Sequence, residues 1–181
     1  QKESTGAKKK YAMLAEDGSI KIKGFELVRR DWSAVARDTQ RRVLEAILKE
    51  GSRQKAVEIV KEVIEELKKG KMPMEKVSIY TQLKKDPKNY DIKSPELSAA
   101  QKAMERGKKI GRGSILSYVI TQKGKSISDK AELAEFAENY DPSYYIDNQV
   151  LPSVMKILKE LGYDEYELKH GGKQKGLGDW F

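Results

Sequence analysis

The sequence predicts an α+β protein that is mostly helical, with an N-terminal β-hairpin, a helical body containing a short β element, and a flexible C-terminal tail. Three observations predict this class. Two β-prone runs flank an Asp17-Gly18 turn, apolar residues recur at helical spacing through the middle of the chain, and glycines recur in its last residues.

The hairpin is expected over residues 11–14 and 20–28, because Asp-Gly between such runs favours a tight turn. A helix is predicted from Ser33, a suitable N-cap, to Gly51. A second is predicted from about Arg53 to Gly70. The short connection between them favours an antiparallel pair.

The remaining elements follow from caps and breakers. A short strand is expected over residues 77–80, and the polar residues 81–89 are expected to be irregular. Ser94 followed by Pro95 favours a helix that ends near Gly107. A strand is predicted over residues 114–122, then a helix over 129–139 that begins with a capping box of Asp129 and Glu132. A last helix is predicted over about 144–161, with a kink at Pro152.

Charge predicts the kind of partner. The 181 residues include 36 Lys and Arg against 28 Asp and Glu, a net charge of +8. This balance favours a polyanionic partner, either nucleic acid or an acidic membrane face. Basic residues dominate residues 101–125, whereas acidic residues dominate 129–168. One face is therefore expected to attract phosphate, and the acidic region is expected to lie away from it.

Several classes of function are disfavoured. There is no apolar run of membrane-spanning length and no signal-peptide pattern, so the chain is expected to be intracellular, in the cytoplasm. With no cysteine, disulfides and thiolate metal sites are excluded. His170 is the only histidine, and neither a phosphate-binding Gly-rich loop nor an Asp-x-Asp pair is present. The chain alone is not expected to catalyse a reaction or to bind a cofactor.

The tail pairs a glycine-rich backbone with two large aromatic side chains. Gln174, Leu177, Trp180 and Phe181 have the spacing of the PIP box, the peptide by which many proteins bind the sliding clamp PCNA, and the tail resembles that motif. On one helical turn the three apolar side chains would form a single plug. The alternative is that Trp180 and Phe181 fold back onto their own domain.

The ordered motifs of the whole chain resemble archaeal family B DNA polymerases, from the end of the palm through the thumb. The residues that carry this resemblance are Lys8-Lys9-Lys10-Tyr11-Ala12, Asp17-Gly18, Gly24-Phe25-Glu26, Val28-Arg29-Arg30-Asp31-Trp32-Ser33, Thr39-Gln40, Val43-Leu44, Arg106-Gly107, Gly113-Ser114, Tyr118-Val119-Ile120, Tyr140-Asp141 and Tyr144-Tyr145-Ile146-Asp147-Asn148-Gln149-Val150-Leu151-Pro152. The high charge and lack of cysteine are also typical of thermophiles.

The resemblance implies a division into the end of the palm (residues 1–32), a thumb (33–168) and a clamp-binding tail (169–181). It implies that Lys8, Lys9, Lys10 and Tyr11 contact the minor groove and terminal phosphates at the primer end, with Lys10 where the family often has Arg. Arg29 and Arg30 would face the primer backbone, and Asp31 would either hold one of them or serve as a salt-bridged cap.

The family's catalytic aspartates, with their Mg²⁺, lie upstream of the lysine motif and have no match in this sequence. The missing initiator Met is expected to reflect a processed product or a fragment. The chain is thus expected to be the C-terminal part or small subunit of such an enzyme, associated with the nucleoid.

Charge and small residues predict further DNA contacts in the thumb. Arg106, Lys108, Lys109 and Arg112 supply cations, and Gly107, Gly111 and Gly113 allow a close backbone approach. Thr81, Gln82 and Lys84 are expected to continue this phosphate track. The alternative is a lysine-rich face that is only solvated.

Three functions are therefore considered. The first is a palm-and-thumb portion that binds primer–template DNA and PCNA and needs a larger polymerase polypeptide for synthesis. The second is a stand-alone duplex-binding module tethered to the clamp. The third is a structural adaptor whose basic surface meets an acidic protein.

Overall fold

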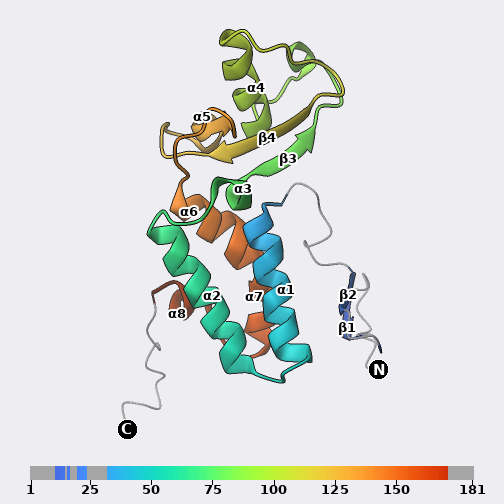
Figure 1. Cartoon of the computed structure of the whole chain (residues 1–181), viewed down its shortest axis with the longest axis vertical. Coiled ribbons are helices and arrows are strands. Elements are labelled where there is room, and N and C mark those ends of the chain that lie inside the picture. Colours follow the sequence, from blue (N-terminus) through green and yellow to red (C-terminus); the bar gives the residue numbers. More distant parts are fainter. Residues whose placement is uncertain (1–10, 15, 17–19, 24–31, 171–181) are drawn as a thin grey trace.

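The computed structural model of the chain describes residues 11–14, 16, 20–23 and 32–170. Figure 1 shows a helical lobe with a smaller α/β lobe stacked on one of its ends. None of the helices in these ranges is long and apolar enough to cross a membrane.

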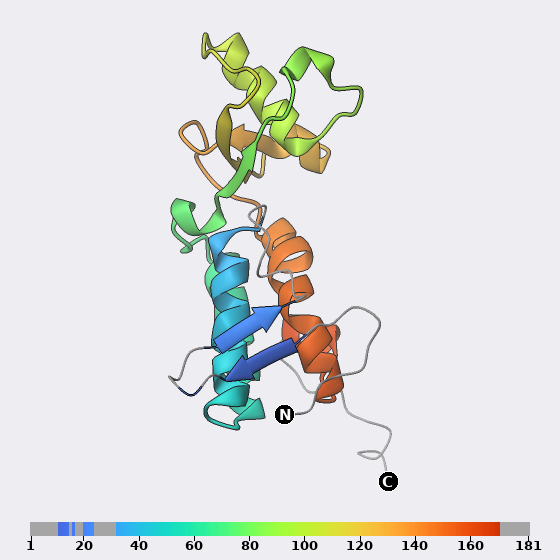
Figure 2. The ribbon, with the colours of Figure 1, turned by 90° about the vertical axis from the view of Figure 1, so that its right-hand side faces the viewer.

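The predicted hairpin is present. Strands β1 (Tyr11–Leu14) and β2 (Ile20–Lys23) pair antiparallel, with Tyr11 opposite Lys23. Strand β1 contacts α1 of the helical lobe, and Figure 2 shows the hairpin crossing in front of that lobe.

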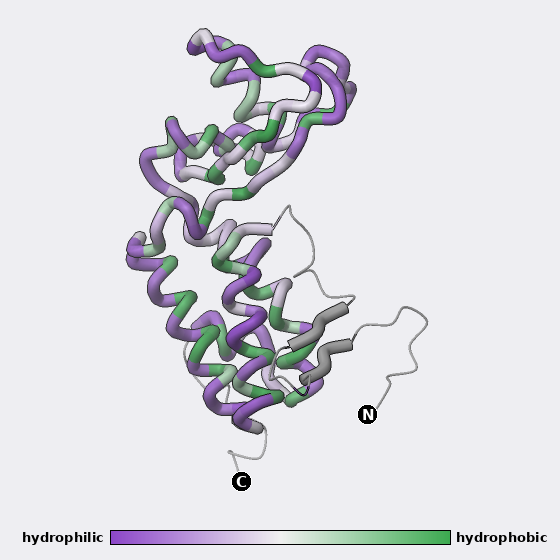
Figure 3. The backbone as a smooth tube through the Cα atoms, turned by 45° about the vertical axis from the view of Figure 1, so that its right-hand side comes forward, coloured by the Kyte–Doolittle hydropathy of each residue, from purple (hydrophilic) through white to green (hydrophobic). Residues whose placement is uncertain are grey.

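The predicted helix pair forms the centre of the helical lobe. Helices α1 (Ala34–Leu48) and α2 (Arg53–Lys68) pack on each other, and each is followed by a glycine with positive φ, Gly51 at 62° and Gly70 at 69°. Apolar residues of both helices are buried in a shared core, and Figure 3 shows hydrophobic (green) segments recurring along the helical lobe. The core of this lobe includes Val43, Val60, Ile64, Leu67, Leu151, Val154, Leu158 and Leu168.

The smaller lobe is built on a three-stranded antiparallel sheet in the order β3-β4-β5. Its strands are β3 (Ile79–Gln82), β4 (Ile115–Ile120) and β5 (Ala131–Leu133). Helix α4 (Pro95–Glu105) contacts β4 and β5. Its buried alanines Ala99, Ala100 and Ala103 let the helix lie close to the sheet.

Strand β3 differs from the expected strand at residues 77–80. Val77 is the last residue of a helical turn, α3 (Met74–Val77), so the strand begins at Ile79. Thr81 and Gln82, which were expected to be irregular, belong to the strand because they pair with Leu116 and Ile115 of β4.

The helix predicted over residues 129–139 is wrong. Only one turn forms, α5 (Ile127–Lys130), and its capping box consists of Ser126 and Asp129. Strand β5 follows at once, with Ala131 and Leu133 buried. The free edge of β4 and this alternation favour a strand over the local helix signal.

The last predicted helix is divided into three segments. It begins with α6 (Pro142–Tyr144), widens into the π-helical turn η3 (Tyr145–Val150), and continues as α7 (Leu151–Glu160). The widened turn lies directly before Pro152, the expected site of a kink. A further helix, α8 (Glu165–His170), was not predicted, and it includes the first two residues assigned to the tail.

Two buried tyrosines join the lobes. The Tyr140 hydroxyl donates to the Leu67 carbonyl oxygen at 2.9 Å and accepts from the Met72 N–H at 3.2 Å. The Tyr145 hydroxyl accepts from the Ile120 N–H of β4 at 3.1 Å. Burial raises the pKa of both phenols, so both stay neutral donors and acceptors. One continuous apolar core runs through both lobes.

Candidate nucleic-acid interface

The residues predicted to contact DNA or the clamp fall into two groups, those that the structure describes and those outside the described ranges. Tyr11 begins β1, and Thr81, Gln82, Lys84 and the residues from 106 to 112 lie in the smaller lobe. The other predicted residues lie outside the described ranges: Lys8, Lys9, Lys10, Arg29, Arg30 and Asp31, together with the clamp-binding residues Gln174, Leu177, Trp180 and Phe181.

Two loops meet at the far end of the smaller lobe. The loop after β3 and the loop before β4 continue the sheet ladder, because the Leu83 N–H donates to the Ser114 carbonyl oxygen at 3.0 Å and the Gly113 N–H donates to the Leu83 carbonyl oxygen at 2.7 Å. The Gln82 side chain also donates to the Gly113 carbonyl oxygen. The Arg112 N–H donates to Oδ1 of Asp86 at 3.2 Å.

The three glycines that were predicted to allow close approach to DNA shape this junction between the loops, and their contact with DNA stays a prediction. A Cβ at Gly111 would lie 3.1 Å from Oδ1 of Asp86, so a larger residue would press on the contact between the loops. Gly107 and Gly113 have φ of 92° and 83° with open space around them. They serve to turn the backbone.

The paired loops display a group of exposed cations that we call the tip cluster: Lys84, Lys85, Lys88, Lys109 and Arg112. None of these side chains forms an ion pair with another described residue, and Asp86 is the only acid within residues 83–90 and 108–113. Figure 3 shows mainly hydrophilic segments there. The sequence did not lead us to predict Lys85 and Lys88 as DNA contacts, although both flank Asp86-Pro87 in the stretch that begins with Lys84.

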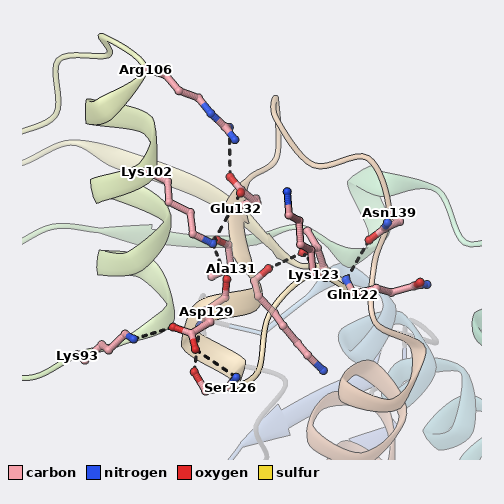
Figure 4. A network of polar contacts seen from close by, with 12 residues as sticks. Lys93, Lys102, Arg106, Gln122, Lys123, Ser126, Asp129, Ala131, Glu132 and Asn139 are labelled. Carbon is pink, nitrogen blue, oxygen red and sulfur yellow. Dashed lines mark hydrogen bonds and ion pairs between the residues drawn. The ribbon is translucent and has the colours of Figure 1, made fainter.

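Arg106 and Lys108, by contrast, bind carboxylates within the chain. Arg106 lies 3.2 Å from Oε2 of Glu132 and over the Phe136 ring at 4.6 Å from its centroid. Lys108 forms an ion pair with Glu135. Figure 4 shows the Arg106–Glu132 contact between α4 and β5.

The expected separation of the two charge signs is therefore wrong for the first part of the acidic region. Glu132 and Glu135 pair with Arg106 and Lys108 just after α4, where Lys102 also approaches Glu132 at 3.7 Å, and Asp129 pairs with Lys93 just before α4. Glu132 lies on β5, which replaced the predicted helix, whereas Asp129 lies in α5 and Glu135 follows the strand. Four of the seven basic residues between 101 and 125 are left without a carboxylate partner among the described residues: Lys109, Arg112, Lys123 and Lys125.

Lys123 and Lys125 project from a tightly held loop between β4 and α5. The Gln122 N–H donates to Oδ1 of Asn139 at 2.9 Å, and the Lys123 N–H donates to the Thr121 hydroxyl at 3.3 Å (Figure 4). Gly124 lies against the backbone of Asp129.

The acidic side of this loop is fixed by Asp129. Its carboxylate lies 2.7 Å from Nζ of Lys93 and accepts from the Ser126 N–H. The hydrogen bond from Lys93, followed by those from Ser126, lowers the pKa of Asp129 to about 2. Asp129 is thus an anion at neutral pH, and it neutralises Lys93.

Comparison with known proteins decides the family. A family model described as DNA polymerase family B matches residues 6–161. The chain belongs to DNA polymerase family B. It is 47% identical over 176 residues to a DNA polymerase of Methanocaldococcus jannaschii, covering 96% of this chain and 11% of that protein. It is 46% identical over 178 residues to a DNA polymerase of Thermococcus sp. strain 9oN-7, covering 96% of this chain and 23% of that protein.

A solved structure agrees with this assignment. The family B DNA polymerase from the hyperthermophilic archaeon Pyrobaculum calidifontis matches 89% of this chain and 21% of its own with a TM-score of 0.75 and 36% identity. The resemblance to archaeal family B polymerases is confirmed. This family B polymerase chain spans between 11% and 23% of the length of the two relatives above.

In this polymerase chain, two segments that carried the resemblance touch each other. Ser33 is fully buried, and both its N–H and its hydroxyl donate to Oε1 of Gln149, at 2.9 and 2.8 Å. The sequence predicted Ser33 as the N-cap of α1, which it is by position, but its side chain makes no capping bond.

Proposed function

We propose that this chain is the palm-end and thumb portion of a family B DNA polymerase, whose thumb grips primer–template duplex and whose tail binds the PCNA sliding clamp. Residues 1–32 would form the end of the palm, 33–168 the thumb and 169–181 the tail. The catalytic aspartates and their Mg²⁺ would lie in a larger polymerase polypeptide, so that the assembly works on DNA at the nucleoid.

The tip cluster carries this proposal. Phosphate binding needs cations that the protein has not already neutralised, and Lys84, Lys109 and Arg112 are exposed with no carboxylate partner among the described residues. Because Arg106 and Lys108 already bind Glu132 and Glu135, the proposal assigns the main phosphate contacts to the tip cluster. Thr81 and Gln82 lie beside it at the end of β3.

Contacts of this kind suit a polymerase because they ignore base identity. Each cation that neutralises a phosphate releases counterions, so affinity depends steeply on salt and little on sequence. We expect two primer–template duplexes of unrelated sequence to bind equally well, with affinity that falls on a log–log plot against salt. Binding that is absent or insensitive to salt would favour the adaptor function instead.

The need for a larger polypeptide is tested by primer extension. The purified chain is expected to incorporate no nucleotide, because the residues that would hold the catalytic Mg²⁺ are expected elsewhere. Addition of a polymerase polypeptide that carries the catalytic palm should restore synthesis. Extension by the chain alone would contradict the proposal.

Clamp binding is tested by retention on immobilised PCNA. Trp180→Ala/Phe181→Ala should abolish retention, since these side chains, with Leu177 and Gln174, form the proposed clamp-binding peptide. Tyr166→Ala, which removes an exposed aromatic residue of α8 close to the tail, is the matched control and should leave retention unchanged. Equal retention of all three proteins would remove the clamp from the proposal.

The proposed role of the tail is to tether the thumb to the sliding clamp. A salt-sensitive grip on duplex dissociates readily, whereas attachment to an encircling clamp raises the local concentration of the thumb at the primer end. The clamp is therefore expected to increase the length of DNA made in each binding event.

A further inference from the structure

Ser33 does not make the capping hydrogen bond that its position at the start of α1 allows. An N-cap serine usually accepts a hydrogen bond from the first turn of its helix, which stabilises the helix. Ser33 has the extended backbone of an N-cap, with φ −61° and ψ 153°, yet its hydroxyl points instead at Gln149. The hydroxyl is used for a contact between residues 116 positions apart in the sequence.

The π-helical turn η3 brings Gln149 to Ser33. In this turn the backbone bonds run five residues back, as from the Leu151 N–H to the Ile146 carbonyl oxygen. The wider turn places Gln149 on the buried side, where it is 6% exposed. Turns of this kind are uncommon and often occur at functional sites.

The Ser33–Gln149 contact is costly to break. A single carboxamide oxygen accepts both donors of Ser33 in the interior, and loss of that oxygen would leave a buried N–H and hydroxyl without partners. The contact therefore fixes both the position of Ser33 and the direction in which the chain enters α1.

We propose that Gln149 is a positioning residue that sets the direction in which the chain enters α1 and thereby the place of the hairpin β1–β2 relative to the thumb. This role rests on the proposed function in one respect: the hairpin carries the predicted primer contact Tyr11, and the thumb carries the tip cluster. With the hairpin and the thumb held in one geometry, Tyr11 and the tip cluster meet one duplex together.

A matched control lies within α1 itself. Gln40 is fully buried, and its Nε2 donates to the Ser153 carbonyl oxygen of α7 at 2.7 Å. It therefore joins α1 to the same C-terminal helical segment by a similar bond, but within α1 rather than at its entry. Gln40→Leu loses this one bond and also removes Oε1 of Gln40, a buried oxygen that has no hydrogen-bond partner, so it should reduce stability less than Gln149→Leu and should not change how the chain enters α1.

The experiment measures a distance in the free protein. The chain has no cysteine, so spin labels at Glu16→Cys and Glu58→Cys report only the distance between the hairpin and α2. We expect a narrow distance distribution in the otherwise unchanged chain and with Gln40→Leu. Gln149→Leu should broaden it, and Ser33→Ala, which keeps the backbone N–H bond, should broaden it less.

The outcomes separate this inference from the proposed function. A distribution that is broad before any substitution, or equally narrow in Gln149→Leu and Ser33→Ala, would overturn the role of Gln149. With primer–template DNA, Gln149→Leu should lower affinity about fivefold, the small end of coupling between sites, while Gln40→Leu should not. If the chain binds no duplex, the proposed function fails while the distance result still stands.

Discussion

At Gly124 the backbone has a φ of 144°, a conformation that L side chains rarely adopt. A Cβ there would lie 2.8 Å from the carbonyl carbon of Asp129 and 2.9 Å from the backbone nitrogen of Lys130, both in the turn that holds the loop of Lys123 and Lys125. The glycine is thus required for steric as well as conformational reasons.

Gly124→Ala is expected to destabilise the protein by about 1–3 kcal/mol, the cost of a strained backbone together with displaced neighbours. Gly51→Ala is the control, because Gly51 also has positive φ but a Cβ there would meet no atom within 4 Å. Chemical denaturation of both variants measures the difference. An equal loss of stability in the two would show that the contact with Asp129 carries no energy.

The ionisation of Asp129 makes the stability of the folded protein depend on pH. Its folded pKa of about 2 lies below the usual 3.8, so its contribution is fully present above about pH 4 and is lost as the pH falls towards 2. Denaturation midpoints measured between pH 2 and 6 should fall less in Asp129→Asn than in the unchanged chain. Lys93→Gln, which removes the largest cause of the shift, should flatten the same window. An unchanged slope in both would contradict this assignment.

Residue identity alone predicted part of this site. The preference of serine for N-caps correctly placed the start of α1 at Ser33, although the Ser33 hydroxyl makes no capping bond in the structure. The partner of its hydroxyl could not be predicted, since Gln149 comes close only through the packing of η3 on α1. The pairing of Arg106 with Glu132 was likewise hidden, because it depends on where β5 lies in the sheet.

Among the helices and strands, the sequence correctly predicted those whose formation depends mainly on neighbouring residues. The hairpin, α1, α2, α4 and β4 follow from turns, caps and periodicity. The structure of residues 129–139 could not be predicted in this way. Pairing of the segment from Ala131 with the free edge of β4 is favoured over the helix that its capping residues predict. The π-helical turn before Pro152 also depends on tertiary contacts, among them the buried Tyr145.

Tyr145 joins the two lobes at that turn. Its fully buried hydroxyl is the acceptor for the Ile120 N–H, so Tyr145→Phe should leave a buried donor unpaired and reduce stability by about 1–3 kcal/mol. Tyr166→Phe removes an exposed hydroxyl and should change stability little. Thermal denaturation compares the two. A Tyr145→Phe variant as stable as Tyr166→Phe would show that the hydroxyl does not join the lobes.

Across the whole molecule, ion pairs divide the basic residues into those neutralised by a carboxylate and those available to bind phosphate. The net charge of +8 predicted a polyanionic partner but not the surface that meets it. The acids of β5 and its surroundings neutralise Lys102, Arg106 and Lys108, whereas the tip cluster has no carboxylate partner within the described ranges. Which predicted cations are available is therefore a property of the tertiary structure.

We infer that the tip cluster, rather than the neutralised cations, grips duplex DNA. Two matched double variants test it: Lys84→Gln/Arg112→Gln removes two available charges, and Arg106→Gln/Lys108→Gln removes two neutralised ones. The measurement is the slope of log affinity for primer–template DNA against log salt. We expect the slope to become shallower by about 1.8 in the first variant, about 0.9 for each phosphate that is no longer neutralised, and to stay nearly unchanged in the second. An equal change in both, or a change only in the second, would contradict it.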